Sequence, residues 1–404
     1  MRITFVSNYI NHHQLPFCDA MQNAGDDVQF SFIQVMPMEE KRVSMGWGVD
    51  EAKIPYLVLY YEEPKKAAEL IRNSDVVLFG WTEGKIKELE EERLSSGKLS
   101  FRVSERIYRE GQWKAVSPKG LVSKYKEHIR YRKLPVYLLC TGAYVASDFD
   151  LIKAYPKKKL KWGYFPDASG IGAGTSADSH MSGQNAENKL RICWAGRMIP
   201  LKHPEYALKL ARALSETGCD FTLDMVGDGR LLPHLKTIAS GMGLTDKVNF
   251  TGGKAPMEVL DYMKRADIFL FTSNYIEGWG AVVNEAMQNG CCVVASKEAG
   301  AVPFLIKDGE NGLIYDKGDY EELERAVLGL VNDRDRIKKL GEAAAETIEK
   351  IWNADNAAKE LLRFCREYLE GKEPSFAKEG PMSVAEHIKA PGFIRTLRED
   401  NHLE

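Results

Sequence analysis

Residues 190–204 read LRICWAGRMIPLKHP and combine an apolar strand, a cationic turn and the start of a helix. The apolar run ends at Gly196, and the cations Arg197 and Lys202 stand directly before a helix predicted over 203–216. Glycine lets a ligand approach the backbone closely, and a helix start carries partial positive charge. Arginine can grip two phosphate oxygens, and lysine adds a compact charge. The stretch favours a diphosphate site; a surface turn with two solvated cations is the alternative.

A second turn of this kind lies in residues 273–287, which read SNYIEGWGAVVNEAM. It follows an apolar run over 268–271, and a Gly-Trp-Gly turn opens a predicted helix. Glu277 stands just before this helix and Glu285 stands inside it. Glycine amides at a helix start suit a phosphate, and an ionised carboxylate, which only accepts hydrogen bonds, suits sugar hydroxyls. A helix cap beside a solvated glutamate is the alternative.

Short apolar runs alternate with helical patterns along most of the chain, as is typical of parallel strands covered by crossover helices. The predicted strands are 3–6, 28–33, 56–59, 76–79, 99–103, 136–140, 190–195, 221–226, 248–250, 268–271 and 293–295. Small and polar residues interrupt the series over 167–189, which we interpret as a linker. We therefore predict two α/β domains, over residues 1–166 and 190–370. The second ends in predicted helices over 321–331, 336–351 and 356–369.

Further motifs follow in a fixed order: VGDG at 226–229, VNFTG at 248–252, ADIFLFTS at 266–273, GCCVVAS at 290–296 and DGENGL at 308–313. With Gly196-Arg197…Lys202 and Glu277…Glu285, they resemble the nucleotide-sugar domain of glycosyltransferase family 4, the group 1 glycosyl transferases. The resemblance covers about residues 190–315, and the first domain is similar only in architecture and chain position. It implies the GT-B fold: two doubly wound, Rossmann-like domains facing across a cleft, with C-terminal helices. The last of these, over 382–400, would pack back on the first domain.

The resemblance also implies roles for individual side chains. Arg197 and Lys202 would hold the diphosphate of a nucleotide-sugar donor and Glu277 would face the donor sugar, and these three form the implied catalytic set. Glu285 would accept hydrogen bonds from the ribose, and Gly227 would let the nucleotide lie close to the backbone. The amides of the Gly-Trp-Gly turn would lie near the phosphates. The implied donor-binding residues are Arg197, Lys202, Gly227, Glu277, Gly278, Trp279, Gly280 and Glu285.

The family transfers sugars with retention at the anomeric carbon, usually without a bound metal, so cations and amides stabilise the leaving diphosphate. We therefore expect a metal-independent hexosyltransferase that needs no cofactor besides its nucleotide-sugar co-substrate. Its acceptor would be a saccharide or a lipid-linked acceptor in cell-envelope or capsular polysaccharide biosynthesis. A GT-B-type nucleotide-sugar epimerase and a non-enzymatic two-domain sugar-binding protein are the alternatives.

In the first domain, Asn11, His12 and His13 follow the first predicted strand and would contact the acceptor if the sheet is doubly wound. A histidine pair that merely caps a helix is the alternative, and no further metal ligand stands at useful spacing from it. Many family members carry a histidine after a mid-domain strand. This chain has Glu105 in the comparable turn, which makes Glu105 the candidate substitute.

Three local features need separate interpretation. His203 stands where glycine often follows the lysine in the family. Asp148-Phe149-Asp150 has the form of a metal-binding motif, but its surroundings favour an ordinary helix segment. The glycines of 170–174 mimic a dinucleotide loop, yet they lack the strand and the helix that such a loop requires, so we assign them to the linker.

A basic stretch in the first domain surrounds one predicted apolar helix face, formed by Leu121, Val122, Tyr125 and Ile129. The basic residues are Lys119, Lys124, Lys126, Arg130, Arg132 and Lys133, followed by Lys153, Lys157, Lys158, Lys159 and Lys161. Such a stretch can bind anionic lipid headgroups, which suggests peripheral contact with the inner face of a membrane. A solvated helix packed on a sheet is the alternative.

Composition excludes several classes of protein. The 55 Lys+Arg and 58 Asp+Glu of the 404 residues nearly cancel, which argues against a general nucleic-acid binder. The seven cysteines are scattered without a CxxC pair, which excludes a disulfide framework or a cysteine-rich zinc site. Since no run approaches about 20 uninterrupted apolar residues, we expect no membrane span and a cytoplasmic protein.

Overall fold

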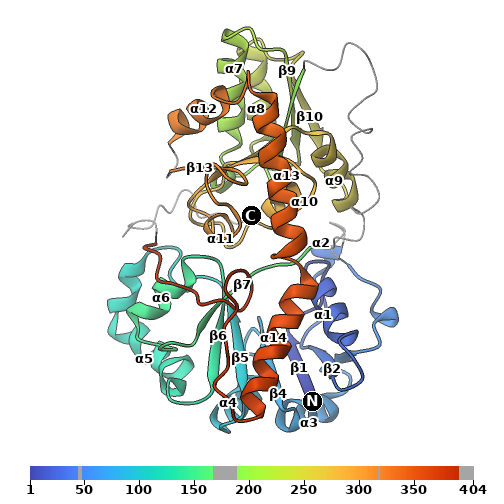
Figure 1. Ribbon diagram of the computed structural model, residues 1–404, viewed down its shortest axis with the longest axis vertical. Coiled ribbons are helices and arrows are strands. Elements are labelled where there is room, and N and C mark those ends of the chain that lie inside the picture. Colours follow the sequence, from blue (N-terminus) through green and yellow to red (C-terminus); the bar gives the residue numbers. More distant parts are fainter. Residues whose placement is uncertain (44–47, 167–188, 317–318, 391–404) are drawn as a thin grey trace. The chain divides into compact units, whose positions relative to one another are not determined.

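The computed structural model describes residues 1–43, 48–166, 189–316 and 319–390. Among these residues the chain forms two compact units. Unit 1 comprises the described residues up to 166 together with 351–390. Unit 2 comprises the described residues 189–316 and 319–350. Each unit holds one parallel sheet flanked by helices (Figure 1). The predicted α/β class with two doubly wound domains is confirmed, whereas the linker over 167–188 lies outside the described residues.

Unit 1 is built on a seven-stranded sheet with the order β3-β2-β1-β4-β5-β6-β7 among the described residues. Its strands are β1 (Arg2–Ser7), β2 (Gln29–Gln34), β3 (Leu57–Leu59), β4 (Val76–Phe79), β5 (Ser100–Ser104), β6 (Val136–Thr141) and β7 (Lys159–Trp162). Its α-helices are α1 (Leu15–Gln22), α2 (Glu40–Arg42), α3 (Pro64–Asn73), α4 (Lys87–Ser95), α5 (Pro118–Glu127), α6 (Val145–Leu151) and α14 (Ala354–Leu369). All four residues of β4 are buried, because helices cover both faces of the sheet.

Unit 2 is built on a six-stranded sheet with the order β10-β9-β8-β11-β12-β13 among the described residues. Its strands are β8 (Leu190–Ala195), β9 (Phe221–Val226), β10 (Val248–Gly252), β11 (Ile268–Phe271), β12 (Cys292–Ser296) and β13 (Leu313–Tyr315). Its α-helices are α7 (Pro204–Glu216), α8 (Leu232–Gly241), α9 (Pro256–Arg265), α10 (Ala281–Gln288), α11 (Val302–Leu305), α12 (Tyr320–Leu328) and α13 (Arg334–Lys350). The sequence pattern misses only β13 among these strands, because a three-residue run is too short to show a period.

Both sheets place their first strand next to a reversal of strand order. β1 lies between β2 and β4, and β8 lies between β9 and β11. In open parallel sheets, ligands bind outside the carboxyl ends of the strands at such a switch point. The turns that follow β1, β4, β8 and β11 are therefore the places where each unit is expected to bind a ligand.

In each sheet an aspartate side chain binds the backbone at the start of the first strand. In unit 1 the backbone N–H of Arg2 donates to Asp75 Oδ2 at 2.7 Å, just before β4. In unit 2 the N–H of Arg191 donates to Asp267 Oδ2 at 2.8 Å, just before β11. Each aspartate thus ties the amino end of the first strand to the strand on the far side of the switch point, although the two halves show no sequence repeat.

Helix α14 belongs to unit 1, so the predicted end of the second domain at residue 370 is wrong. The apolar side of this helix packs on the first sheet: the Phe364 ring lies 5.6 Å from that of Phe101 and 4.9 Å from that of Tyr137, centroid to centroid. Arg366 also forms an ion pair with Asp27 at 3.0 Å. Figure 1 shows α14 lying along the strands of unit 1. Helical periodicity located the helix, but it carries no information about which sheet the apolar stripe covers.

The helix predicted from residue 382 is absent over its described part, residues 382–390, and residues 391–400 lie outside the described chain. Met382–Ala385 instead run antiparallel to β7, with hydrogen bonds from Lys161 N to the Ser383 carbonyl at 2.7 Å and from Ala385 N to the Lys159 carbonyl at 3.0 Å. The edge of β7 offers backbone groups that this segment pairs with. The sequence pattern also misses β7 itself, because its Lys-Leu-Lys-Trp alternation lacks an apolar run.

Candidate functional site

The two sequence motifs of unit 2 meet at its switch point. Thr272, directly after β11, donates from Oγ1 to the carbonyl of Lys202 at 2.5 Å. The backbone N–H of Asn274 donates to the carbonyl of Leu201 at 2.9 Å. A small apolar cluster completes the junction, and its members are Ile199, Leu201, Tyr275 and Ile276. The turn after β8 and the turn after β11 therefore form one rigid surface at the carboxyl end of the sheet.

Lys202 and Glu277 form an ion pair at the centre of this surface, with 14% and 17% of their side chains exposed. Burial raises the pKa of Glu277, but the charge and hydrogen bond of Lys202, a hydrogen bond from Ser273 and the charge of Arg197 outweigh it and bring the pKa below its ordinary value. Glu277 is therefore ionised at neutral pH. Arg197 is exposed, so its guanidinium is accessible to an anion from solvent.

The backbone conformation at His203 is one that favours glycine, the residue that often stands at this position in the family. Its backbone has φ +44° and ψ +51°, which is the left-handed region that glycine adopts without strain. The side chain is held on both sides: Nδ1 lies 2.8 Å from Glu205 Oε1, and Nε2 lies 3.3 Å from Asn274 Nδ2. These contacts join the start of α7 to the turn after β11, so the histidine strengthens the junction that glycine would leave without side-chain bonds.

The Gly-Trp-Gly turn opens α10 as predicted, and the ring of its tryptophan is buried. Trp279 is 1% exposed, and its Nε1 donates to Asn284 Oδ1 at 2.7 Å. The ring of Trp279 therefore belongs to the core, and it stays a prediction that the amides of this turn lie near the donor phosphates. Gly280, with φ +93°, is the N-cap of α10, and a Cβ there would lie 2.7 Å from the Phe271 ring. The Gly278 carbonyl accepts from Gly300 N at 3.1 Å, which fixes the turn.

Gly227 is required by the protein backbone itself. Its φ is +135°, and a Cβ at this position would lie 2.0 Å from the carbonyl oxygen of Gly196. The same turns are tied by hydrogen bonds from Gly196 N to the Val226 carbonyl at 3.0 Å and from Met198 N to the Asp228 carbonyl at 2.8 Å. The structure thus gives a reason for glycine within the protein itself, and it stays a prediction that Gly227 also lets a nucleotide lie close to the backbone. Gly227 lets the turn after β9 pack closely against the turn that carries Arg197.

Glu285 lies in the second turn of α10 with a half-buried side chain. Burial raises the pKa of this carboxyl to about 7. Glu277 and Glu285 therefore differ in protonation although both stand near the start of one helix: Glu277 is an acceptor at neutral pH, whereas Glu285 is close to its titration point.

The raised pKa of Glu285 predicts a dependence of stability on pH. The unfolded carboxyl titrates near about 4.3, so between about 4.3 and 7 the folded chain holds a proton that the unfolded chain has lost. This contribution is fully present at low pH and is lost as pH rises through about 7. Relative to Glu285→Gln, the wild type should therefore lose on the order of 2 kcal/mol between pH 5 and pH 8. Urea unfolding at several pH values measures this loss. The exposed-site control Glu310→Gln keeps Glu285 and should lose stability as the wild type does, whereas an equal loss in Glu285→Gln would contradict the prediction.

Only some of the predicted acceptor-binding residues of unit 1 lie close to one another. The His12 and His13 rings lie 3.9 Å apart, and His13 lies 5.8 Å from the Tyr164 ring. Glu105 Oε1 accepts a hydrogen bond from the Tyr164 hydroxyl at 3.1 Å. His13 and Glu105 thus meet through a tyrosine that sequence reasoning missed. Asn11 Oδ1 accepts from the His13 N–H at 3.0 Å, which shapes the turn into α1.

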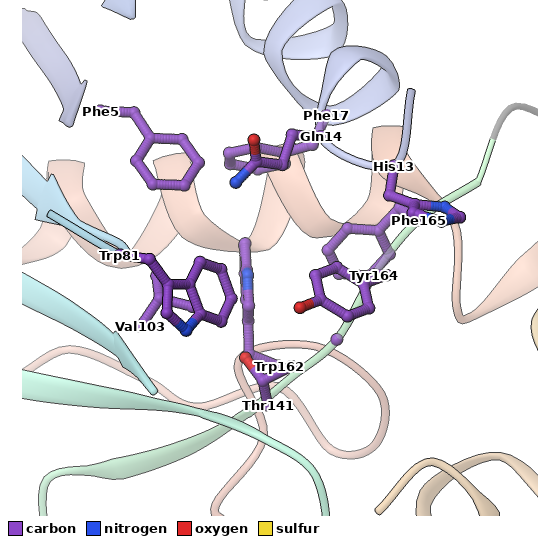
Figure 2. A pocket seen from close by; sticks show the side chains of 11 residues that line it. Phe5, His13, Gln14, Phe17, Trp81, Val103, Thr141, Trp162, Tyr164 and Phe165 are labelled. Atoms are coloured by element: carbon purple, nitrogen blue, oxygen red, sulfur yellow. The ribbon is translucent and has the colours of Figure 1, made fainter. Parts of the chain in front are cut away.

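Residues that sequence reasoning missed line a pocket beside these candidates, and Figure 2 shows Trp81, Gln14, Thr141 and Tyr164 around it with His13. Thr141 directly follows the predicted strand 136–140 and Trp81 lies two residues after the predicted strand 76–79, and these positions are the signal that could have found them. Tyr164 follows β7, which the sequence pattern does not reveal.

Metal ligands do not gather in the described chain: no group of three or more His, Cys, Asp or Glu side chains is placed there to hold an ion. The carboxylates of the 148–150 motif are engaged elsewhere. Asp148 is fully buried and pairs with Arg106 at 3.1 Å, and Asp150 pairs with Lys159 at 2.9 Å. These aspartates stabilise α6 and its surroundings, in agreement with the interpretation of the motif as a helix segment.

Comparisons with known proteins agree with this geometry. A mannosyltransferase of Mycobacterium tuberculosis, described as GDP-mannose-dependent alpha-(1-6)-phosphatidylinositol monomannoside mannosyltransferase, is 30% identical over 176 residues, 42% of this chain and 46% of its own length. The amylovoran biosynthesis glycosyltransferase AmsK of Erwinia amylovora is 30% identical over 177 residues, 43% of each chain. The alignments thus span less than half the length of these relatives.

Among solved structures, HepE of Anabaena, crystallised in complex with UDP, matches with a TM-score of 0.67 over 92% of this chain and 100% of its own. At 16% identity this likeness shows the fold alone, and it confirms the predicted GT-B class. The family model described as Glycosyl transferases group 1 matches residues 177–347, which span the two motifs of the site. The predicted resemblance to the group 1 glycosyl transferases is therefore confirmed, and it covers unit 2 of this chain.

Proposed function

We propose that this protein is a glycosyltransferase that binds a nucleotide-diphosphate sugar in unit 2 and transfers the sugar to an acceptor bound in unit 1. The observation that carries the proposal is the Lys202–Glu277 ion pair, which stands beside the exposed Arg197 at the switch point. Cations for a diphosphate and an ionised acceptor for sugar hydroxyls are thus adjacent on one rigid surface. The names of the relatives, a mannosyltransferase and a polysaccharide-biosynthesis glycosyltransferase, support the same class of reaction.

The proposed chemistry is electrostatic. When the glycosidic bond to the diphosphate breaks, negative charge grows on the departing phosphate, and Arg197 and Lys202 would stabilise it together with the amides at the start of α10. Lys202 would then exchange its bond to Glu277 for one to phosphate, which frees the carboxylate to accept hydroxyls of the donor sugar. We infer retention at the anomeric carbon, no metal and no further cofactor, and a role in cell-envelope or capsular polysaccharide assembly in the cytoplasm.

A melting-temperature panel of nucleotide diphosphates and nucleotide sugars tests the donor site. A ligand at a hundred times its dissociation constant should stabilise the protein by about 2.7 kcal/mol. We expect stabilisation by at least one nucleoside diphosphate and a weaker effect in Arg197→Ala. If no nucleotide raises the melting temperature, the proposed donor site is wrong. Release of free nucleotide with no glycoside product would instead favour the epimerase.

Helix α5 supports the proposal that unit 1 touches an anionic membrane. Its apolar residues Leu121, Val122 and Tyr125 are 39%, 58% and 57% exposed, and no residue of the helix is buried. Lys119 and Lys126 are exposed beside them. In the second basic cluster, Lys153 and Lys157 are exposed, whereas Lys159 lies in β7, is 9% exposed and pairs with Asp150. No helix of the described chain is both long and apolar enough to cross a membrane.

Sedimentation with vesicles tests this contact. The wild type should bind phosphatidylglycerol vesicles in a salt-sensitive way, and the double variant Val122→Ser/Tyr125→Ser should bind roughly tenfold more weakly. Leu369→Ser, which changes an exposed leucine (45%) on α14, is the matched control. Equal binding by both variants, or none by the wild type, would contradict the membrane contact.

A further inference from the structure

His203 has a strained backbone beside one of the two charged groups of the site. Its φ of +44° and ψ of +51° lie in the left-handed region, which an L side chain adopts only at a cost. Such residues cluster at functional sites, where the surrounding contacts hold them in place. His203 directly follows Lys202, and 24% of its side chain is exposed to solvent. The strain therefore lies on a side chain that can exchange protons with water.

The bonds of Asn274 determine which imidazole nitrogen carries the proton. The backbone N–H of Ile276 donates to Asn274 Oδ1 at 3.0 Å, so the oxygen of this amide is fixed and its NH2 group faces His203. Because an NH2 group only donates, His203 Nε2, 3.3 Å away, is the acceptor. Nδ1, 2.8 Å from Glu205 Oε1, then carries the single proton of the neutral ring and donates to the carboxylate. The contacts thus specify one neutral tautomer.

The contacts of His203 join the turn that carries Lys202 to the turn that carries Glu277. The Asn274 carbonyl accepts from the N–H of Glu277 at 3.0 Å, so the Asn274 side chain and backbone link the imidazole to the backbone of Glu277. This link, which we call the histidine tie, does not involve the ion pair between Lys202 and Glu277. It therefore persists when a diphosphate draws Lys202 away from the carboxylate. The bonds of Thr272 Oγ1 and Asn274 N described above also join the turns, but only the histidine tie contains a group that titrates near neutral pH.

We propose that His203 is a positioning residue of the donor site and that it acts only as the neutral imidazole. A second proton, on Nε2, sets two donors against each other at Asn274, so the histidine tie opens and the turn that carries Glu277 loosens. Sugar transfer then falls in acid because of His203. The inference rests on the proposed function for this effect on transfer, whereas the histidine tie itself is a property of the fold of unit 2.

Other charged and titratable groups surround His203 and the Tyr206 ring, which stacks on the imidazole at 5.0 Å and 26°. They are Lys202, Glu205 and Lys209 along the chain, Glu277 after β11, Glu298 after β12, and Asp319 and Tyr320 at the start of α12. Burial and the carboxylate of Glu205 raise the pKa of Tyr206, so its hydroxyl stays neutral. The pKa of Glu277 lies below its ordinary value, so this carboxylate stays ionised in mild acid. Glu285, with a pKa of about 7, titrates in the same site, and its effect must be separated from that of His203.

Rates of sugar transfer between about pH 8 and about pH 5, where histidine side chains ordinarily change charge, test the proposal. His203→Gly removes both side-chain bonds and relieves the backbone strain. At about pH 8 it should lower kcat roughly 10- to 100-fold, while the affinity for a nucleoside diphosphate changes less than about threefold. Its melting temperature should change by no more than about 4 °C, so the loss is not one of folding. His203→Gln, whose amide oxygen can accept from Asn274 in place of Nε2, should recover much of the rate at every pH.

The ratio of the wild-type rate to the His203→Gly rate separates His203 from Glu285, because both chains keep Glu285 and its titration cancels. This ratio should fall toward one as the pH decreases. When both chains carry Asn274→Asp, it should rise in acid instead, because a carboxylate accepts only from the protonated ring. His387→Asn, which changes an exposed histidine of unit 1, should follow the wild type. A ratio that does not change with pH, or equal rates of the wild type and His203→Gly, would overturn the proposal.

Hydrogen exchange of peptides covering residues 272–280 gives a readout that does not require transfer. After correction for the intrinsic exchange rate, protection in the wild type should fall in acid to the level of His203→Gly, and it should stay constant in His203→Gln. If protection behaves in this way but no nucleotide sugar yields a glycoside, the histidine tie stands and the proposed transferase function fails. If glycoside forms and neither protection nor the rate ratio depends on His203, the function stands and the positioning role of His203 is wrong.

Discussion

Replacing Glu277 by glutamine is expected to lower the rate of sugar transfer by roughly 10²- to 10³-fold, the usual effect of removing one pre-organised electrostatic group from an active site. Lys202, Ser273 and Arg197 keep the carboxylate ionised in the structure. Glutamine keeps the size of the side chain but loses the charge that binds sugar hydroxyls and balances Lys202. Transfer from a nucleotide-sugar donor, measured as glycoside formed, tests this expectation.

Binding of a nucleoside diphosphate separates this loss from unfolding, because such a ligand lacks the donor sugar that Glu277 is proposed to contact. It should bind Glu277→Gln nearly as well as the wild type. Arg197→Ala should lose both diphosphate binding and transfer while the chain remains folded, since Arg197 is exposed. Glu310→Gln, an exposed carboxylate of unit 2, is the matched control. Full transfer activity in Glu277→Gln or in Arg197→Ala would contradict the assignment of the donor site.

Replacing Gly227 by alanine is expected to destabilise unit 2 by at least about 3 kcal/mol, the sum of backbone strain and steric overlap. The φ of +135° disfavours any L side chain, and the added Cβ would lie 2.0 Å from the Gly196 carbonyl oxygen. That oxygen belongs to a turn fixed by hydrogen bonds, so it cannot move aside. Urea-dependent hydrogen exchange of the β8 and β9 peptides reports the loss for unit 2 alone.

Gly243→Ala is the matched control for backbone strain. Gly243 also has a positive φ, +69°, but no atom lies within 4 Å of the Cβ that alanine would add. This variant should lose only about 1–2 kcal/mol, the cost of a left-handed residue. If the two variants lose equal stability, the close approach of the turns after β8 and β9 is not what requires glycine at position 227.

Much of the fold could be read from local sequence. The strands Val76–Phe79, Leu190–Ala195 and Phe221–Val226 lie at the predicted positions, because strands buried on both faces need continuous apolar runs. β7 and β13 were missed, since one alternates lysine with apolar residues and the other has three residues. The predicted helix over 382–400 is absent in its described part because the edge of β7 supplies a backbone partner, which no local pattern reveals.

The candidate site, too, was predicted from the sequence only in part. The spacing of Arg197, Lys202, Glu277 and Glu285 identified two turns that the tertiary structure joins at one switch point. The burial of the Trp279 ring and its bond to Asn284 could not be predicted, because no local pattern indicates burial of a tryptophan between two glycines. Tyr164 escaped notice since it follows a strand that carries no clear pattern.

The sequence alone determined that the chain is an α/β protein with two doubly wound domains and that its chemistry lies in the turns after particular strands. Hydrophobic period and glycine placement are local properties, and they specify strands, helices and turns without reference to distant residues. Only the tertiary structure decided that Lys202 pairs with Glu277, that α14 covers the first sheet, and that Trp81, Thr141 and Tyr164 share one pocket. These outcomes depend on which surfaces residues distant in sequence bring into contact, and that is fixed by packing rather than by the order of residues along the chain.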